Sequence, residues 1–539
     1  MAIIKLLLLL LVLLGPAVAR ADDEGGGDEA DRPEVVIGER LFLETRFAQF
    51  FQARAGGNVN AVLPQGDPVM STLDTTGGPI PGPFPGGGMN CRACHLVDDA
   101  KETPGGGNRS YADFARHSPI PAREDGRTMT PRNSPPLVNA SLARPRPFFL
   151  HFDGEFPSTV ALVEGTLTGR NFGWLPDERG QAVAHIAAVI RGDDGTGQLA
   201  RDNGGAYRRV LGGSDPSIAK ELRLSKRFRV DVDRASDEQI LRAVARLISA
   251  YVESLEFENA SPYDRFLEKN GLPSEPREFE SKADYLKRLR FLMGEHGDPE
   301  PITDADGAFQ LHEQQFVFGA DELEGLRIFL DRNRGNCVAC HPPPLFTDFG
   351  FHNTGVAQEE YDALHGAGSF AALAIPDDSA RKADPDAFLP ATPVHPAARE
   401  PFRSIPAADA PGRTDLGVWN LLRNPDYPRR TYQRHLETMV CASQGPPSGC
   451  RRSPDALLAA SVALFKTPGL RDLGHSGPYL HNGSKDTLED VVRFYLNASA
   501  LARAGQLRNG ARELRAMNIG TGDIVPLAAF LRSLNEDYE

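Results

Sequence analysis

The most restrictive feature of this chain is the spacing of its six cysteines. Four of them form two segments of one pattern, Cys91-Arg92-Ala93-Cys94-His95 and Cys337-Val338-Ala339-Cys340-His341. Cys-x-x-Cys-His is the attachment signature of c-type haem. Two thiols add to the two vinyl groups on one edge of the porphyrin, and the adjacent histidine reaches the iron as its proximal ligand. The sequence therefore predicts two covalent c-type haems, held by Cys91, Cys94, His95, Cys337, Cys340 and His341.

Two other functions use a Cys-x-x-Cys spacing. A zinc site usually takes two such pairs that lie much closer in the chain than Cys91 and Cys337 do. A thioredoxin-type redox site needs a βαβ context, and none is visible here. The remaining Cys441 and Cys450 bracket a turn-rich stretch, and we expect them to form a disulfide in an oxidising compartment. The alternative is a redox-active pair.

The first 21 residues have the composition of an export signal. A positive charge at Lys5 precedes an apolar run, Leu6 to Leu14, and Ala19-Arg20-Ala21 is a small-x-small cleavage site. The run is too short to span a bilayer comfortably, although an uncleaved anchor is the alternative. We expect a signal peptide at residues 1–21, a mature start at Asp22, a periplasmic location and no stable membrane insertion.

Charge narrows the range of partners. The chain has a formal net charge of −14, which argues against a nucleic-acid partner and favours a basic protein partner.

Hydrophobic periodicity predicts a mainly α fold. Apolar residues recur at helical spacing over Val36–Phe51, Asp237–Leu255, 320–334 and Ile524–Leu534, and Ser236 is placed to cap the second of these. No segment alternates for long as a strand would. Residues 55–88 and 99–147 are rich in proline and glycine, and such long irregular segments need an organiser, which a large apolar macrocycle supplies. We expect two cytochrome c-like haem domains at residues 22–300 and 301–539, with loops over 342–460 and a linker over 256–315 that contains a short charged helix near Ala283–Met293.

Several segments together resemble the bacterial dihaem cytochrome c peroxidases and the related enzyme MauG. They are Gly38-Glu39-Arg40-Leu41-Phe42, Arg132-Asn133-Ser134-Pro135, Phe152-Asp153-Gly154, Phe465-Lys466-Thr467-Pro468-Gly469-Leu470-Arg471 and Gly477-Pro478-Tyr479-Leu480-His481-Asn482-Gly483. The resemblance implies two cytochrome c-like domains whose haems divide the labour. The peroxidatic haem on His95 is open to hydrogen peroxide, and the electron-transfer haem on His341 is six-coordinate.

The resemblance also implies further ligands. The axial ligand of the second haem is methionine in the peroxidases and tyrosine in MauG, and the matching position is Tyr495. The alternative is a tyrosine that only packs on its helix. A calcium ion bridges the two domains in many relatives, and its positions match Asn133, Ser476 and Pro478. The alternative for Asn133 is to cap a turn.

The sequence departs from the family at the residue between the haems and in the distal peroxide pocket. The tryptophan between the haems is replaced by Phe152, and the distal glutamine and glutamate fall on Leu162 and Phe172, which cannot move a proton. Glu164 is the nearest acid and is our candidate for the catalytic role, although a solvated helix glutamate is the alternative. His117 and His151 are candidate sixth ligands or distal bases of the first haem, or else packing residues.

The resemblance leads to one functional hypothesis and two alternatives. The first is a periplasmic peroxidase that reduces hydrogen peroxide with electrons from a small donor protein, a cytochrome c or a cupredoxin. The alternatives are a MauG-like peroxide-dependent oxidase of a protein substrate and a non-catalytic dihaem electron-transfer protein. A homodimer is also among the implied assemblies.

Overall fold

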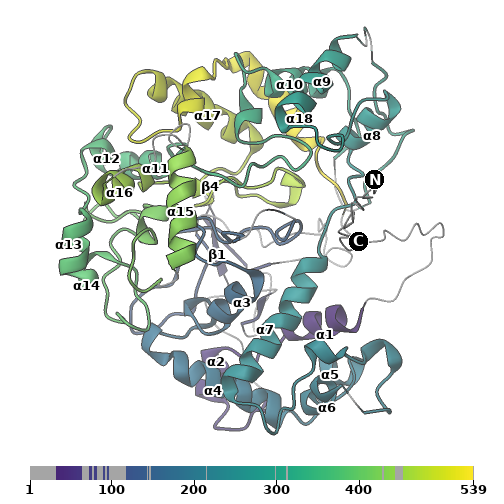
Figure 1. Ribbon diagram of the computed structural model, residues 1–539, viewed down its shortest axis with the longest axis vertical. Helices are drawn as coiled ribbons and strands as arrows, with labels where there is room; N and C mark the ends of the chain where they lie inside the picture. Colours follow the sequence, from purple (N-terminus) through teal and green to yellow (C-terminus); the bar gives the residue numbers. More distant parts are fainter. Residues whose placement is uncertain are drawn as a thin grey trace, which may run out of the picture.

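The computed structural model describes residues 32–62, 72–75, 78–81, 89–91, 94–95, 117–142, 144, 147–213, 215–295, 297, 299–310, 314–427, 430–443 and 453–537. The predicted signal peptide at 1–21 and Cys450 lie outside these residues. The described chain is mostly helical (Figure 1). Its strands form two small antiparallel pairs, β1 (Thr72–Thr75) with β2 (Gly78–Pro81) and β3 (Phe351–His352) with β4 (Phe465–Lys466). The predicted mainly α class is confirmed.

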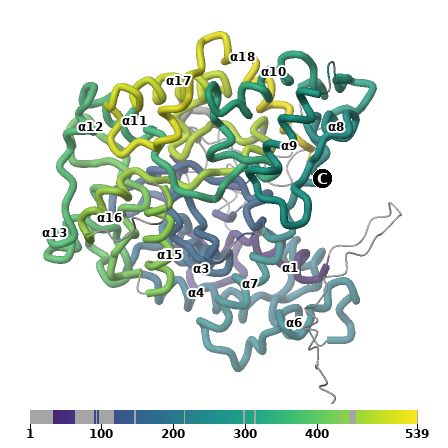
Figure 2. The backbone as a smooth tube through the Cα atoms, turned by 45° about the horizontal axis from the view of Figure 1, so that its top comes forward, coloured from purple at the N-terminus to yellow at the C-terminus, as the bar shows by residue number. Residues whose placement is uncertain are grey.

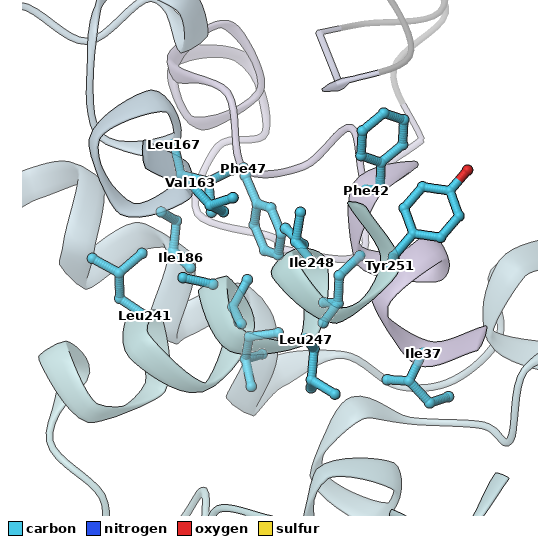
Figure 3. Close-up of a cluster of buried hydrophobic side chains, with 14 of the residues drawn as sticks. Ile37, Phe42, Phe47, Val163, Leu167, Ile186, Leu241, Leu247, Ile248 and Tyr251 are labelled. Carbon is cyan, nitrogen blue, oxygen red and sulfur yellow. The ribbon is translucent and has the colours of Figure 1, made fainter. Parts of the chain in front are cut away.

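The first hydrophobic core is built around the long helix α7. The helices of this part are α1 (Pro33–Phe42), α2 (Gln49–Arg54), α3 (Thr159–Leu167), α4 (Arg179–Gly192), α5 (Gln198–Asp202), α6 (Tyr207–Gly212) and α7 (Asp237–Ser254). Helices α1, α3 and α4 all pack against α7. Figure 3 shows Phe47 and Ile186 turned towards Leu241 and Ile248 of α7, and Phe42 beside Tyr251.

The sequence explains where α7 begins. Ser236 accepts a hydrogen bond from the backbone N–H of Gln239, and the Gln239 side chain accepts one from the Ser236 N–H, which completes a capping box. The predicted helix and its cap are therefore confirmed. The predicted helix over Val36–Phe51 is instead divided into α1 and α2, and in the segment between them Arg46 forms ion pairs with Glu44 and with Asp193.

The second core holds the other haem motif. Its helices are α8 (Pro262–Lys269), α9 (Lys282–Glu295), α10 (Ala320–Leu330), α17 (Leu488–Arg503) and α18 (Ile524–Arg532). We expected residues 256–315 to be a linker and the domain boundary to lie at residue 300. The structure differs, because apolar side chains of α8 and α9, such as Phe266 and Leu289, pack in the second core. The first core already ends at Phe257.

The two cores repeat one helix crossing. A Cβ on Gly38 of α1 would lie 2.2 Å from the Leu247 carbonyl oxygen of α7, and one on Gly325 of α10 would lie 2.0 Å from the Pro526 carbonyl oxygen of α18. Only glycine lets the helices approach this closely. Each crossing helix is followed in sequence by a Cys-x-x-Cys-His segment, which supports the prediction of two related haem domains.

Residues 356–464 form a third unit, here called the inserted lobe. Its helices are α11 (Val356–His365), α12 (Ser369–Ala372), α13 (Asp378–Ala383), α14 (Pro385–Phe388), α15 (Arg430–Ser443) and α16 (Pro454–Ser461). They lie together along one side of the molecule in both views (Figures 1 and 2). We expected mainly loops here, but the lobe has its own core around the fully buried Trp419.

Cys441 in α15 is disulfide-bonded, as expected, while Cys450 lies outside the described residues.

Within the described part of the chain, no helix combines the length and the apolar character needed to cross a membrane.

Candidate haem and peroxide sites

The first Cys-x-x-Cys-His segment faces a cavity of about 1300 Å³, which Cys91, Cys94 and His95 line. This volume exceeds the roughly 300–1,000 Å³ of common small-molecule pockets. Its apolar walls come from the first core and include Phe42, Met89, Val163, Leu167, Phe172 and Ile248. The cavity therefore has the size and lining that a large apolar macrocycle requires.

The motif cysteines are inert as redox groups in this protein. All four are free thiols. Burial raises the pKa of Cys91 and of Cys94 to about 12, so both are neutral. A thioredoxin-type cysteine needs the opposite, a lowered pKa. The environment therefore does not favour thiol redox chemistry and leaves thioether attachment as the use that fits.

Both motif histidines are in the form that binds iron. Burial lowers the pKa of His95 to about 4, and it lowers that of His341 as well, so both rings are neutral. Nδ1 of His341 lies 2.8 Å from the carbonyl oxygen of Phe346 and donates to it. This bond leaves Nε2 as the nitrogen with a free lone pair, the usual way in which a second contact orients an axial histidine.

Two half-buried basic side chains test whether a haem fits the first cavity. Lys466 and Arg144 both line it, and among the described residues neither forms an ion pair with a carboxylate, although Arg144 donates to the carbonyl oxygens of Phe148 and Ala140. Burial, together with the nearby Arg144, lowers the pKa of Lys466 to about 7. An anion bound in the cavity would favour the charged form of Lys466 and give both side chains an ionic partner. The two propionates of a haem are such anions, so the residues present fit the cofactor.

Tyr495 of α17 packs against the second core, as Cys337 of the second motif does. Burial raises the pKa of Tyr495, and the thiols of Cys340 and Cys337 add to this. No hydrogen bond of that hydroxyl is seen within the described residues. The structure thus brings Tyr495 and the second motif together, and the ligand role stays a prediction.

A tight loop presents the residues around the Phe-Asp-Gly segment. Leu150 and Phe156 pair as an antiparallel bridge, with N–H to O distances of 2.8 and 3.4 Å, so residues 151–155 close on themselves. Gly154 has φ +81°, and a Cβ there would lie 2.7 Å from the ring of Phe351. Only glycine therefore fits at this point of the loop.

The loop residue Asp153 joins two parts of the protein. Arg132 forms an ion pair with Asp153 at 2.6 Å and donates two hydrogen bonds, of 2.6 and 3.0 Å, to the carboxylate of Asp415 in the inserted lobe. The pKa of Asp415 is lowered because Arg132 outweighs the effect of burial. The network fastens the loop to the lobe.

A buried polar cluster in the first cavity was not foreseen as a unit. The Glu155 carboxylate accepts hydrogen bonds from Arg403 at 3.2 Å and from the Tyr427 hydroxyl at 2.9 Å, and it lies 3.3 Å from Nδ1 of His151. All four residues line the cavity. Sequence proximity to Phe152-Asp153-Gly154 could have pointed to His151 and Glu155. Nothing in the sequence indicated Arg403 and Tyr427, which the inserted lobe contributes.

The catalytic assignment of Glu164 is not supported by its position. Its carboxylate binds Nε of Arg242 at 3.1 Å, away from the cavity. Its neighbours Val163 and Gly165 line the cavity, whereas Glu164 does not, because consecutive residues of a helix point in different directions. The structure therefore favours the alternative interpretation of a glutamate on the outer side of α3.

The remaining predicted residues lie between the two halves. His117 is not in the cavity and lies 3.4 Å from the carboxylate of Glu360. Nδ2 of Asn133 donates to the Pro478 carbonyl oxygen at 2.6 Å, so two predicted calcium positions are adjacent. The Ser476 hydroxyl is 2.9 Å from the Asp472 carbonyl oxygen. The Pro478 oxygen thus accepts a hydrogen bond from the Asn133 amide in this structure, and calcium binding stays a prediction.

Phe152, His481 and Phe465 form a group of neighbouring aromatic rings. The His481 ring stacks on Phe465 with centroids 3.6 Å apart, and its centroid lies 6.3 Å from that of Phe152. Burial lowers the pKa of His481 to about 4, so this ring is neutral. Phe152 thus lies beside stacked rings, although it lacks the easily oxidised indole of the family's tryptophan.

Comparisons with known proteins found relatives of one kind. Cytochrome-c peroxidase IdrP2 of Denitromonas iodatirespirans is 24% identical over 251 residues, which are 46% of this chain and 46% of that protein. IdrP2 of Pseudomonas sp. (strain SCT) is 38% identical over 76 residues, 14% of this chain and 18% of its own length. Methylamine utilization protein MauG of Methylophilus methylotrophus is 23% identical over 212 residues, 39% of this chain and 36% of that protein.

The chain thus spans less than half the length of the curated relatives it matches. No family model matches it. Among solved structures, the diheme peroxidase BthA of Burkholderia thailandensis is 18% identical, with 94% of this chain and 87% of that chain covered and a TM-score of 0.43.

Proposed function

We propose that this chain, whose relatives are cytochrome c peroxidases and MauG, is a periplasmic dihaem c-type peroxidase that reduces hydrogen peroxide with electrons from a small redox protein. The observation that carries the proposal is the large cavity at the first motif, with neutral thiols, a neutral histidine and two basic side chains that form no ion pair with a described carboxylate. The leader expected at residues 1–21 supports export.

The residues divide into two haem sites in this proposal. Cys91, Cys94 and His95 hold the first haem, and Lys466 and Arg144 bind its propionates. When bound, the haem iron supplies the redox chemistry. The protein shields this site from water with the inserted lobe, which lines the cavity from residue 391 to Tyr427.

The second haem is the electron-transfer site. Cys337, Cys340 and His341 hold it, and Tyr495 is its second axial ligand, which gives the fixed coordination that fast electron transfer needs. An ion bridging Asn133, Ser476 and Pro478 would be calcium, because all three offer oxygen atoms.

The position of Tyr495 also favours a second candidate, a MauG-like oxidase of a protein substrate. A phenolate is a hard, strongly donating ligand that stabilises ferric iron relative to a thioether. The second haem would then work without prior reduction, as oxidation of a protein substrate requires.

The test begins with the holoprotein. We expect two haems per chain that survive acid extraction of the denatured protein, and consumption of peroxide with a reduced cytochrome c or cupredoxin as donor. Consumption with a protein substrate but with neither donor would select the second candidate. Two haems without any turnover of peroxide would leave only an electron carrier, and a single haem or a zinc ion would refute the proposal.

A further inference from the structure

We propose that His151, oriented by Glu155, is the proton-transferring group of the first haem site. This inference rests on the proposed peroxidase function and names the residue that replaces the missing distal glutamine and glutamate.

Among the described residues, the α3 side chains that line the cavity include no acid or base. Leu162 and Phe172, the positions that match the distal pair, both line the cavity and carry apolar side chains. Four further acidic residues line the cavity besides Glu155. Glu124, Asp125 and Asp177 are exposed, and Glu400 forms an ion pair with Arg127. A proton-transferring group must therefore come from another element.

His151 faces both the cavity and α3. It lines the same cavity as His95. Its ring packs edge-on against Phe156, with centroids 4.8 Å apart. A Cβ on Gly165 of α3 would lie 2.5 Å from that same phenylalanine. His151 is thus placed on the side of the cavity that α3 covers.

Glu155 determines which nitrogen of His151 is available. Arg403, His151 and Tyr427 surround the Glu155 carboxylate, and Arg403 and His151 hold its pKa well below the usual range against the effect of burial. An ionised carboxylate only accepts hydrogen bonds, so the Nδ1 atom of His151 carries the proton that it donates to Glu155. Nε2 is then the atom that can accept a proton within the cavity.

The loop holds His151 in a position that the chain does not adopt freely. His151 has φ +64°, in the left-handed region that non-glycine residues seldom occupy. The Leu150–Phe156 bridge and the Glu155 contacts maintain it. Strain maintained in this way is common at functional sites.

The proton transfer only moves a proton between the two peroxide oxygens, and the full reaction takes two electrons from the donor of the proposed function and two protons from solvent. Nε2 of His151 takes the proton of one peroxide oxygen and gives it to the other, which leaves as water when the O–O bond breaks. Over a full turnover peroxide takes up two electrons and two protons and becomes two water molecules. The electrons come from the donor through the haem sites, and His151 returns to its starting state.

The test compares His151→Gln, His151→Ala and Glu155→Gln with Glu164→Gln as matched control, all as holoproteins. A general acid–base group contributes about 10²–10⁴-fold. We expect His151→Gln to lower the rate constant for peroxide by about that factor in stopped-flow mixing, with two haems per chain and an unchanged resting spectrum. Glu155→Gln should lower it less, and Glu164→Gln should match the wild type. Added imidazole should restore part of the rate in His151→Ala.

Three results would overturn the inference. An unchanged rate constant in His151→Gln removes the residue from the reaction. A resting first haem that changes from six-coordinate to high-spin in both His151 variants makes His151 an iron ligand instead. Lost activity with no rescue by imidazole and a lower haem content makes it a structural residue. If the wild type itself consumes no peroxide, the proposed function fails, which is a separate outcome.

Discussion

Replacing Arg132 by methionine should cost more stability than any exposed ion pair of this protein. The guanidinium binds two carboxylates, Asp153 at 2.6 Å and Asp415 at 2.6 and 3.0 Å, whose side chains are 0% and 4% exposed. Arg403 lies 3.8 Å from Asp153 and mainly serves Glu155, so it cannot replace the lost cation. Removing one partner of such a buried set costs about 3–5 kcal/mol.

The assay is urea unfolding of the holoprotein followed by circular dichroism, with Arg242→Met as control. The Arg242–Glu164 pair has a similar length, 3.1 Å, but Arg242 is 68% exposed, so its loss should cost at most about 1 kcal/mol. Adding Asp415→Asn to Arg132→Met should recover part of the loss, because one of the two uncompensated charges is then gone.

The pH dependence of the stability difference between wild type and Arg132→Met gives an independent test. Arg132 lowers the pKa of Asp415, so its contribution is present above the unfolded pKa of about 3.9 and is lost as the pH falls through the lower folded value. In Arg132→Met the Asp415 carboxylate becomes easier to protonate. The stability difference between wild type and variant should therefore shrink as the pH falls from 7 towards 4. Equal losses for Arg132→Met and Arg242→Met at pH 7 would refute the reasoning.

Four further outcomes are expected. Tyr495→Phe should change the absorption spectrum and raise the reduction potential of the second haem while leaving the first unchanged; an unaltered potential would make Tyr495 a packing residue. Cys337→Ser with Cys340→Ser should leave one covalent haem by mass spectrometry, and retention of both would contradict the assignment. Gly325→Ala should destabilise the protein by about 1–3 kcal/mol in urea unfolding, because its Cβ would overlap the backbone of α18; a neutral result would show that the helices separate freely. Chelation by EDTA should lower the melting temperature, and Asn133→Ala should abolish that effect if calcium binds there.

The haem motifs could be recognised in the sequence because each is a short continuous segment. All the atoms that attach one haem lie within five consecutive residues, so no tertiary information is needed to recognise Cys91 to His95. The same holds for α7, whose apolar spacing and Ser236 cap are properties of one segment. The mainly α class followed from such segments.

Assignments that depend on the direction of a side chain could not be made reliably from the sequence. Glu164 was close in sequence to the matched distal positions, yet one helix residue of difference turned it towards Arg242 and out of the cavity. The inserted lobe was expected to consist mainly of loops, whereas the structure has helices there that bury Trp419 together.

The sequence by itself was enough to recognise the two Cys-x-x-Cys-His segments, Cys91 to His95 and Cys337 to His341, because the whole pattern lies within five consecutive residues. Covalent attachment of a haem at each of them stays a prediction. Only the tertiary structure decided which polar groups enter the first cavity. Glu155 meets Arg403 and Tyr427 across more than 240 residues of chain, and the burial of that carboxylate is favourable only where the folded lobe supplies its partners. Contacts between such distant residues depend on how the lobe packs, which no local pattern encodes.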